Sequence, residues 1–119
     1  MITITAVEPS ATAVHAAVLA ELHAVCFSTA WLAGEIIELL AMPGAFAGIA
    51  AVDGDPCGFH LSRSAGSEAE IISIGVEREA RLRGVGGALL KDVFARGNSS
   101  GASAVFVEVA EDNAAALSL

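Results

Sequence analysis

The chain has no tyrosine, one tryptophan and two cysteines in 119 residues. Two cysteines are too few for a disulfide framework, so we expect Cys26 and Cys57 to be buried reduced thiols, with a single disulfide as the alternative. No stretch approaches the ~18 uninterrupted apolar residues of a membrane span, although 55% of the residues are hydrophobic. The N-terminal stretch 1–5 lacks the basic residues of a signal peptide and alternates like a strand. These absences predict a cytoplasmic protein without membrane association.

Positive charge is scarce and unevenly placed. Six Lys and Arg residues stand against 14 Asp and Glu residues, giving a net charge of −8. This balance argues against non-specific binding to nucleic acid. The first basic residue is Arg63, and most of the others fall in the range 78–96. Such concentration predicts an anion site there; for Lys91 and Arg96 a solvated helix face is the alternative.

A strand and a helix flank this basic stretch. The β-branched run 71–76 predicts a strand that ends where charged residues begin. Val85, Leu89 and Val93 then recur at helical spacing, which predicts a helix from about residue 84. The connection between the two elements is therefore short and basic.

Glycines and arginines make up this connection. Gly84, Gly86 and Gly87 fall at the expected start of the helix, directly after Arg81 and Arg83. The first N–H groups of a helix have no internal partners, and the helix dipole makes that end positive. Glycines let a ligand approach the backbone, so the stretch predicts a pyrophosphate site. A glycine-rich helix start without a ligand is the alternative.

The spacing distinguishes among phosphate-binding motifs. A Walker A loop needs a lysine after the glycines, and a dinucleotide fingerprint needs a third glycine where Leu89 stands. What remains is Arg-x-x-Gly-x-Gly, which resembles the acetyl-CoA motif of the GNAT superfamily of N-acetyltransferases. The resemblance implies that acetyl-CoA is bound by residues Ile74, Gly75, Val76, Arg81, Leu82, Arg83, Gly84, Val85, Gly86, Gly87 and Asn113.

Two further segments resemble the RimI-type branch, the ribosomal-protein alanine N-acetyltransferases. The first is His-x-x-x-Phe-x-x-x-Trp at residues 23–31, and the second is Val107–Ala116. Judged as single residues, His23 and Trp31 are also typical of a buried core, where large aromatic side chains dominate the burial energy.

Glu108 interrupts an otherwise apolar strand. An unpaired buried carboxylate is costly, so Glu108 either faces solvent or lines a cleft. The resemblance implies that it is the general base, and that Asn113 contacts the coenzyme in addition to capping a helix. It also implies acetyl transfer from acetyl-CoA to a primary amine, here a protein or peptide N-terminus, without a metal. A small-molecule amine acceptor and an acyl-CoA-binding module without turnover are the alternatives.

The pattern predicts one α/β domain over residues 1–119, with helices on both faces of a mixed sheet in the GNAT-like order β-α-α-β-β-β-α-β-α. Strands are expected at 2–7, 45–52, 57–63, 68–76 and 104–109. Helices are expected at 14–25, from 28 or 29 to 42, at 84–97, and from 112 or 113 onward. The buried positions of the first two helices are expected to be Val14, Val18, Leu22 and Val25, and then Leu32, Ile36, Leu39 and Leu40.

The missing tyrosine departs from the family pattern. GNAT enzymes commonly use a tyrosine to protonate the leaving thiolate, and the RimI-type branch would continue past Leu119 with Leu-Tyr and two more strands. We therefore expect a C-terminally incomplete chain that lacks the last family strands and has weak or no turnover. Its open sheet edge would favour a homodimer.

Overall fold

The computed structural model describes residues 1–7, 12–27 and 31–107. The elements follow one another as β1 (Ile2–Val7), α1 (Thr12–Cys26), α2 (Ala33–Leu40), β2 (Ala45–Val52), β3 (Asp55–Ala65), β4 (Glu68–Val76), the short 3₁₀ helix η2 (Arg78–Ala80), α3 (Val85–Ser99) and β5 (Ala104–Val107). No helix in these residues is long and apolar enough to cross a membrane.

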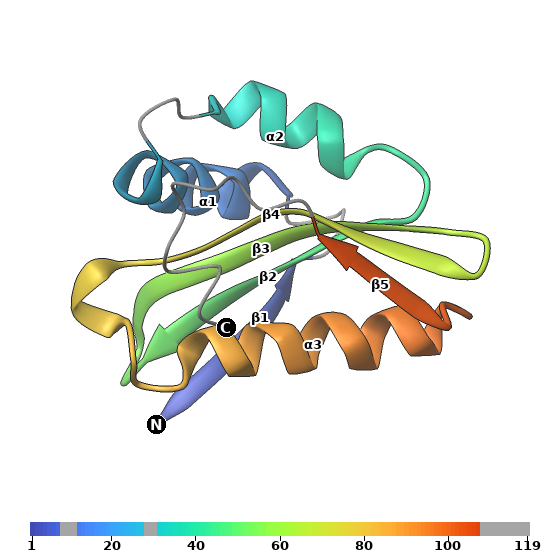
Figure 1. Cartoon of the computed structure of the whole chain (residues 1–119). Helices are drawn as coiled ribbons and strands as arrows, with labels where there is room; N and C mark the ends of the chain where they lie inside the picture. Colours follow the sequence, from blue (N-terminus) through green and yellow to red (C-terminus); the bar gives the residue numbers. More distant parts are fainter. Residues whose placement is uncertain (8–11, 28–30, 108–119) are drawn as a thin grey trace.

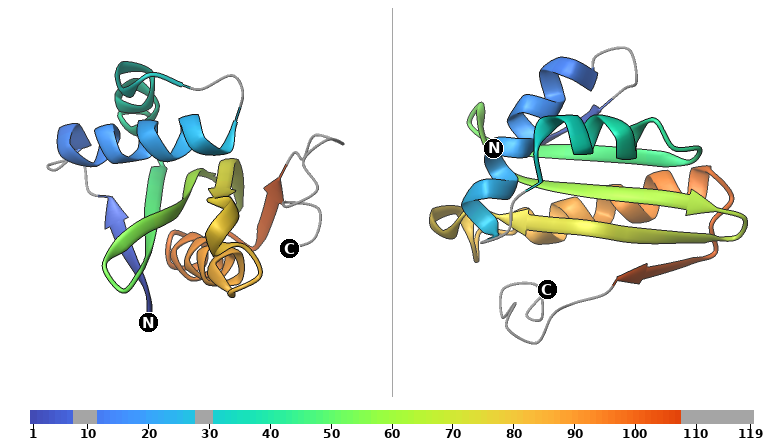
Figure 2. Two further views of the ribbon diagram at one scale, coloured as in Figure 1. Left: turned by 90° about the vertical axis from the view of Figure 1, so that its left-hand side faces the viewer. Right: turned by 90° about the horizontal axis from the view of Figure 1, so that it is seen from above.

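The five strands form one sheet in the order of the sequence. Strands β1 to β4 pair antiparallel as a meander, and β5 pairs parallel to β4 after the α3 crossover. Helices α1 and α2 cover one face of the sheet and α3 covers the other (Figures 1 and 2). The predicted α/β class, with a mixed sheet between two helical layers, is therefore confirmed, while the final predicted helix lies outside the described residues.

Local sequence sets the β2–β3 hairpin. Val52 pairs with Asp55, so only Asp53 and Gly54 form the turn. Both have positive φ, 50° and 89°. This is the type I′ geometry that Asp-Gly favours, because its twist matches that of the flanking strands.

Each face of the sheet has its own apolar core. On the α1 and α2 face the fully buried centre is Phe59, with Leu19, Ile36 and Leu61 around it. On the opposite face the predicted helical stripe of Val85, Leu89 and Val93 packs on the sheet. Because apolar side chains point from the sheet toward the helices on both of its faces, both helical layers are needed to bury the sheet.

The predicted buried stripe of α1 is wrong at both ends. Val14 and Val25 are 72% and 63% exposed, whereas Ala16 and Leu19, neither of which was predicted, are fully buried. Alanine fills so many positions of α1 that several faces are almost equally apolar. The packing partners, α2 and the sheet, therefore decide which face turns inward.

Helix α2 also starts later than predicted. Its first residue is Ala33 and its N-cap is Leu32, which is 71% exposed instead of buried. The side chain of Glu35 accepts the Leu32 N–H at 3.0 Å and so caps the helix from within. The predicted caps, residues 28 and 29, lie outside the described residues.

Candidate active site between β4 and α3

A β-bulge in β4 changes which of its side chains point to each face of the sheet. Ser62 pairs with Ile71 but Leu61 pairs with Ser73, so Ile72 is an extra residue in β4. Ile71 and Ile74 both point into the core beneath α3. Bulges bend a strand and re-aim its side chains, and they are frequent beside functional sites.

Beyond the bulge, β4 has a described partner on one side only. Residues 74–76 pair with 58–60 of β3. On the other side the described pairing with β5 covers only 68–71 with 104–107, and β5 diverges from β4 (Figure 2). The predicted coenzyme residues Ile74, Gly75 and Val76 therefore lie at the C-terminal end of β4, where it leads into the basic connection.

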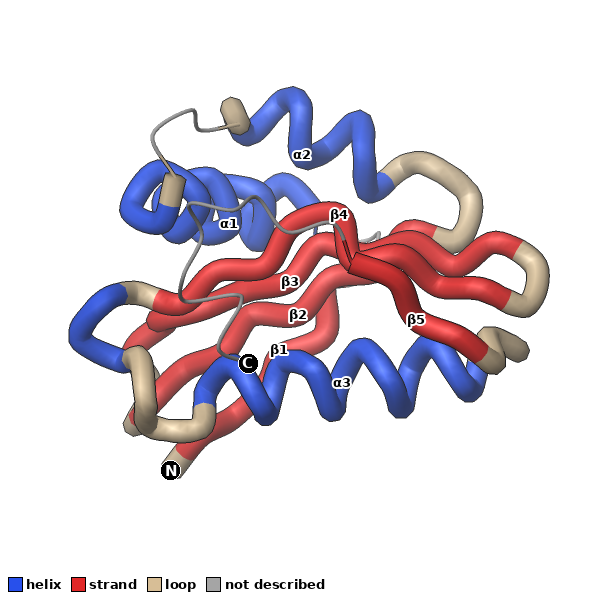
Figure 3. The backbone as a smooth tube through the Cα atoms, viewed as in Figure 1, coloured by secondary structure: helices blue, strands red, loops and turns tan. Residues whose placement is uncertain are grey.

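A helical turn that the sequence reasoning missed leads from β4 to α3. It is η2, visible as the short helical segment after β4 in Figure 3. Arg81 follows it and donates from Nε to the Val76 carbonyl oxygen at 3.0 Å. Arg81 therefore fixes the loop to the end of the strand, a role that its spacing did not reveal, while its side chain remains exposed.

The start of α3 presents unpaired backbone donors. The first intrahelical bond runs from the Ala88 N–H to the Gly84 carbonyl at 3.0 Å, and no side chain caps the helix. Among the described residues, the N–H groups of Val85, Gly86 and Gly87 have no acceptor. Gly84 has φ +86°, a conformation that costs other residues about 1–2 kcal/mol. Such an end is suited to an anion.

The predicted site residues of this loop differ in exposure. Leu82 is fully exposed with φ +65°, and Arg83, Gly84 and Gly87 are exposed. Val85 and Gly86 are buried instead. The structure thus brings the glycines and arginines together at one end of α3, but Val85 contributes packing and only its N–H remains for a ligand.

Cys26 reaches the same strand end from α1. A Cβ placed on Gly75 would lie 3.0 Å from Cys26 Sγ and 3.0 Å from Phe59 Cε1, so only glycine fits between these side chains. Burial raises the pKa of the Cys26 thiol, and the nearby charge of Arg81 offsets part of that effect. Cys26 is partly buried, Cys57 is buried, and both are free thiols as predicted.

His23 belongs to a buried aromatic cluster. Its ring stacks on Trp31 with centroids 5.1 Å apart and lies 4.7 Å from Phe27 and 5.6 Å from Phe59. The backbone N–H of Trp31 donates to Nδ1 of His23 at 3.2 Å. Burial lowers the pKa of His23, partly offset by Glu35. The ring is 4% exposed, so the core interpretation of this residue is the one that its surroundings favour.

A second buried histidine was missed by the sequence reasoning. His60 is fully buried and contacts Ser62 on its own strand and Asp92 on α3. A signal was present in the sequence, because the polar residues His60 and Ser62 alternate with the apolar residues Phe59 and Leu61. Asp92 similarly interrupts the face of α3 between Leu89 and Val93.

The predicted base Glu108 and the predicted coenzyme contact Asn113 lie outside the described residues, which end at Val107. Within the described ranges no group of three or more His, Cys, Asp or Glu residues is placed to hold a metal ion.

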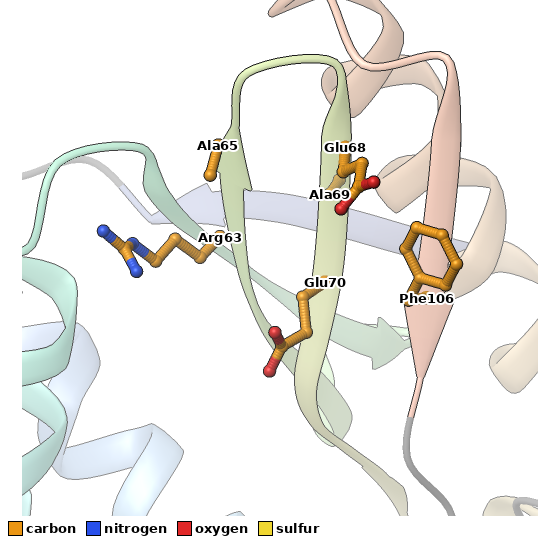
Figure 4. A pocket seen from close by; sticks show the side chains of 6 residues that line it. All are labelled: Arg63, Ala65, Glu68, Ala69, Glu70 and Phe106. Atoms are coloured by element: carbon orange, nitrogen blue, oxygen red, sulfur yellow. The ribbon is translucent and has the colours of Figure 1, made fainter.

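A cavity of about 250 Å³ lies at the opposite end of β4. Glu68 and Glu70 project into it from β4, and Phe106 forms its wall from β5 (Figure 4). Gly75 lies five residues after Glu70 along β4, which corresponds to roughly 16 Å in an extended strand. The cavity is thus separate from the start of α3, and Arg63 lines it together with the two carboxylates.

Comparison with known proteins assigns the family. The model of the acetyltransferase (GNAT) family matches residues 16–119, whereas no curated protein sequence matches significantly.

Solved structures share the fold at low identity. The ribosomal-protein-S18-alanine N-acetyltransferase of Escherichia coli is 21% identical, with a TM-score of 0.80 over 99% of this chain and 73% of its own. An aminoglycoside acetyltransferase from an uncultured soil metagenomic sample is 19% identical, with a TM-score of 0.80 over 96% and 83%. The ribosomal-protein-alanine N-acetyltransferase of Brucella melitensis is 17% identical, with a TM-score of 0.76 over 99% and 86%.

The family model spans most of the chain, and the fold and the donor-rich start of α3 agree with it. The chain therefore belongs to the GNAT family of acetyltransferases.

Proposed function

We propose that this protein transfers an acetyl group from acetyl-CoA to a primary amine, most simply the N-terminus of a protein or peptide. The observation that carries the proposal is the start of α3, where three consecutive N–H groups lack acceptors among the described residues. Gly84 precedes them in the left-handed region, and exposed Arg83 lies beside them. These donors would hold the pyrophosphate of the coenzyme.

The end of β4 would hold the reacting carbonyl. Ile74, Gly75 and Val76 follow the bulge, and their pairing with β3 fixes them in place. A backbone N–H from this stretch would donate to the carbonyl oxygen as charge develops on it, which is the largest stabilisation that such a site usually provides. Anchoring the pyrophosphate at α3 would fix the thioester against this strand.

The acceptor amine must lose a proton to attack. A free α-amino group has a pKa of about 7.7–8.0 and is mostly protonated at neutral pH. We propose Glu108, the base that the resemblance to the RimI-type branch implies, as the group that removes the proton, directly or through water. The thiolate that leaves must be protonated, and none of the 119 residues is a tyrosine.

The acceptor class rests on similarity and charge. The likeness of residues 23–31 to the RimI-type branch favours a protein N-terminus. A net charge of −8 favours any cationic acceptor. Because solved structures of similar fold include aminoglycoside acetyltransferases, an aminoglycoside is the second candidate.

Two measurements test the proposal. Calorimetric titration with acetyl-CoA measures coenzyme binding, and release of free CoA in the presence of an alanine-initiated peptide or an aminoglycoside measures turnover. We expect Glu108→Gln to abolish any turnover that the chain supports while coenzyme binding is retained. Glu21→Gln, an exposed position on α1, serves as the matched control and should change neither. Absence of acetyl-CoA binding by the unaltered chain would refute the proposal, and binding without turnover of any amine would favour the binding module.

A further inference from the structure

A polar cluster joins the middle of α3 to two strands of the sheet. His60 Nε2 lies 2.7 Å from Asp92 Oδ2, and its Nδ1 lies 2.9 Å from Ser62 Oγ. Arg96 donates from Nη1 to the same Asp92 oxygen at 2.9 Å and to the Ala47 carbonyl of β2 at 2.8 Å. Two of these four contacts join different elements: His60–Asp92 links β3 to α3, and Arg96–Ala47 links α3 to β2.

The surroundings of the cluster leave no spare room. A Cβ on Gly48 would lie 2.8 Å from Asp92 Oδ2 and 2.9 Å from His60 Nε2. The Phe46 ring packs edge-on against His60 at 5.6 Å and beneath the Arg96 guanidinium at 5.1 Å. His60 and Ser62 are fully buried. A glycine at position 48 therefore leaves the space that the contact between His60 and Asp92 needs.

The charged groups facing His60 all come from α3. They are Asp92 and Arg96, the two that influence its protonation. Among the described residues, β2 contributes only Gly48 and Phe46 to its surroundings, and β4 places Ile74 opposite it. Apart from burial, which has the largest effect on the pKa of His60, its protonation therefore depends on two charged groups of α3.

Directional contacts restrict α3 in a way that its apolar face does not. Burial of Val85, Leu89 and Val93 stabilises the helix against the sheet, but the hydrophobic effect has no direction and tolerates small shifts. Hydrogen bonds of 2.7–2.9 Å weaken steeply when donor and acceptor move apart or lose alignment. The polar cluster therefore adds directional restraints on where along the sheet the helix lies.

We propose that His60, Asp92 and Arg96 are positioning residues, which hold α3 at the place where its first N–H groups meet the coenzyme pyrophosphate. This inference rests on the proposed function. Asp92 lies seven residues after Val85, or ~10 Å along the helix at 1.5 Å per residue, so a shift of the cluster is transmitted rigidly to the binding end. A misplacement of ~1 Å in a positioned catalytic site can lower the reaction rate about 100-fold.

Protonation of His60 gives the inference a pH signature. In the neutral ring, Nε2–H donates to Asp92 while Nδ1 accepts from the Ser62 hydroxyl. A second proton on the ring abolishes the acceptor at Nδ1 and places two cations, His60 and Arg96, on one carboxylate oxygen. Burial lowers the pKa of His60, with Asp92 offsetting part of that effect, so the ring is neutral at pH 7. We expect coenzyme binding to weaken as the pH falls through the lowered pKa of His60, which lies below the ordinary value of about 6.5.

The test compares binding with folding for the full chain. The Kd for acetyl-CoA is measured at pH 7.5, under conditions where urea titration shows each variant to be folded. We expect Asp92→Asn and Gly48→Ala to raise Kd about tenfold, the first by weakening the cluster and the second by displacing it without a change of charge. Val93→Ala, a buried truncation on the same helix, is the control, with lower stability but a Kd within about twofold of the parent.

The pH arm uses His60→Gln, whose amide can still donate to Asp92 but does not titrate. The parent should lose affinity between pH 7.5 and 5.5 beyond the loss seen for His60→Gln. Equal pH profiles for the parent and His60→Gln would overturn the inference. The inference would also be overturned if Asp92→Asn and Gly48→Ala lost stability but kept the parent Kd, because the cluster would then be merely structural.

A readout without ligand separates this inference from the proposed function. Amide chemical shifts and hydrogen exchange of Val85–Gly87 report the position of the helix start directly. If the parent binds no acetyl-CoA, the proposed function fails, and the inference is then decided by these amides. Changes at Val85–Gly87 in Gly48→Ala but not in Val93→Ala support it, and unchanged amides refute it.

Discussion

Gly84 offers the sharpest separation of folding from ligand binding in this protein. It is the N-cap of α3, with φ +86° and ψ 5°. A Cβ added there would meet only Ile2 Cδ1 at 3.9 Å, so Gly84→Ala introduces backbone strain without a steric clash. We expect the strain to cost about 1–2 kcal/mol. This corresponds to a fall in Tm of about 4–8 °C for a chain of this size.

The matched control lies at the other end of the same helix. Gly101 has φ +95°, and a Cβ there would meet nothing within 4 Å. Gly101→Ala should therefore lose about the same 1–2 kcal/mol, far from the N-terminal amides. The two variants differ in position relative to the proposed pyrophosphate site and not in the kind of strain that they introduce.

Binding should distinguish the two variants. Relief of the strain at Gly84 moves the peptide that leads into α3, and with it the N–H groups of Val85 and Gly86. Loss of one hydrogen bond to a charged phosphate, worth about 1.5–3 kcal/mol, raises the Kd for acetyl-CoA by roughly 10- to 100-fold. Calorimetric titration of both folded variants measures this. Equal Kd values for Gly84→Ala and Gly101→Ala would refute the assignment of the glycine to ligand binding.

Three further outcomes follow from the described contacts. His23 and His60 both have a pKa lowered by burial. Below about pH 6.5 the unfolded state then binds more protons than the folded state. The urea concentration at the unfolding midpoint should therefore decrease when the pH is lowered from 7.5 to 5.5. Phe59→Ala removes a fully buried ring beneath α1 and should cost about 3–5 kcal/mol in urea unfolding. Arg81→Met breaks the bond to the Val76 carbonyl, which should lower stability by about 0.5–1.5 kcal/mol and weaken acetyl-CoA binding in calorimetry; an unchanged Kd would leave Arg81 with the structural role alone.

Local signals determined much of the architecture. Strand boundaries at 2–7, 45–52 and 68–76 match the predictions, because alternation and β-branched runs are read over a few residues. The Asp-Gly turn and the buried stripe of Val85, Leu89 and Val93 could likewise be predicted, because turn geometry and helical periodicity depend on residues that are close in sequence. The glycine and arginine spacing also located the donor-rich start of α3.

Contacts between distant segments were beyond such reasoning. The face of α1 that turns inward depends on α2 and the sheet, and the alanine-rich sequence leaves it open, which is why Val14 was misassigned. The tether from Arg81 to Val76 requires the loop to fold back on the strand. The packing of Cys26 against Gly75 requires α1 to lie on β4.

The sequence alone predicted the family, the order of the described elements and the donor-rich start of α3, because each of these is encoded in short-range spacing. Only the tertiary structure decided that His60 and Asp92, 32 residues apart, form one buried pair. Their meeting depends on the antiparallel register of β2 and β3 and on the crossover that lays α3 across them. A pattern along the chain specifies which residues can interact, but the packing of helix on sheet selects which of them do.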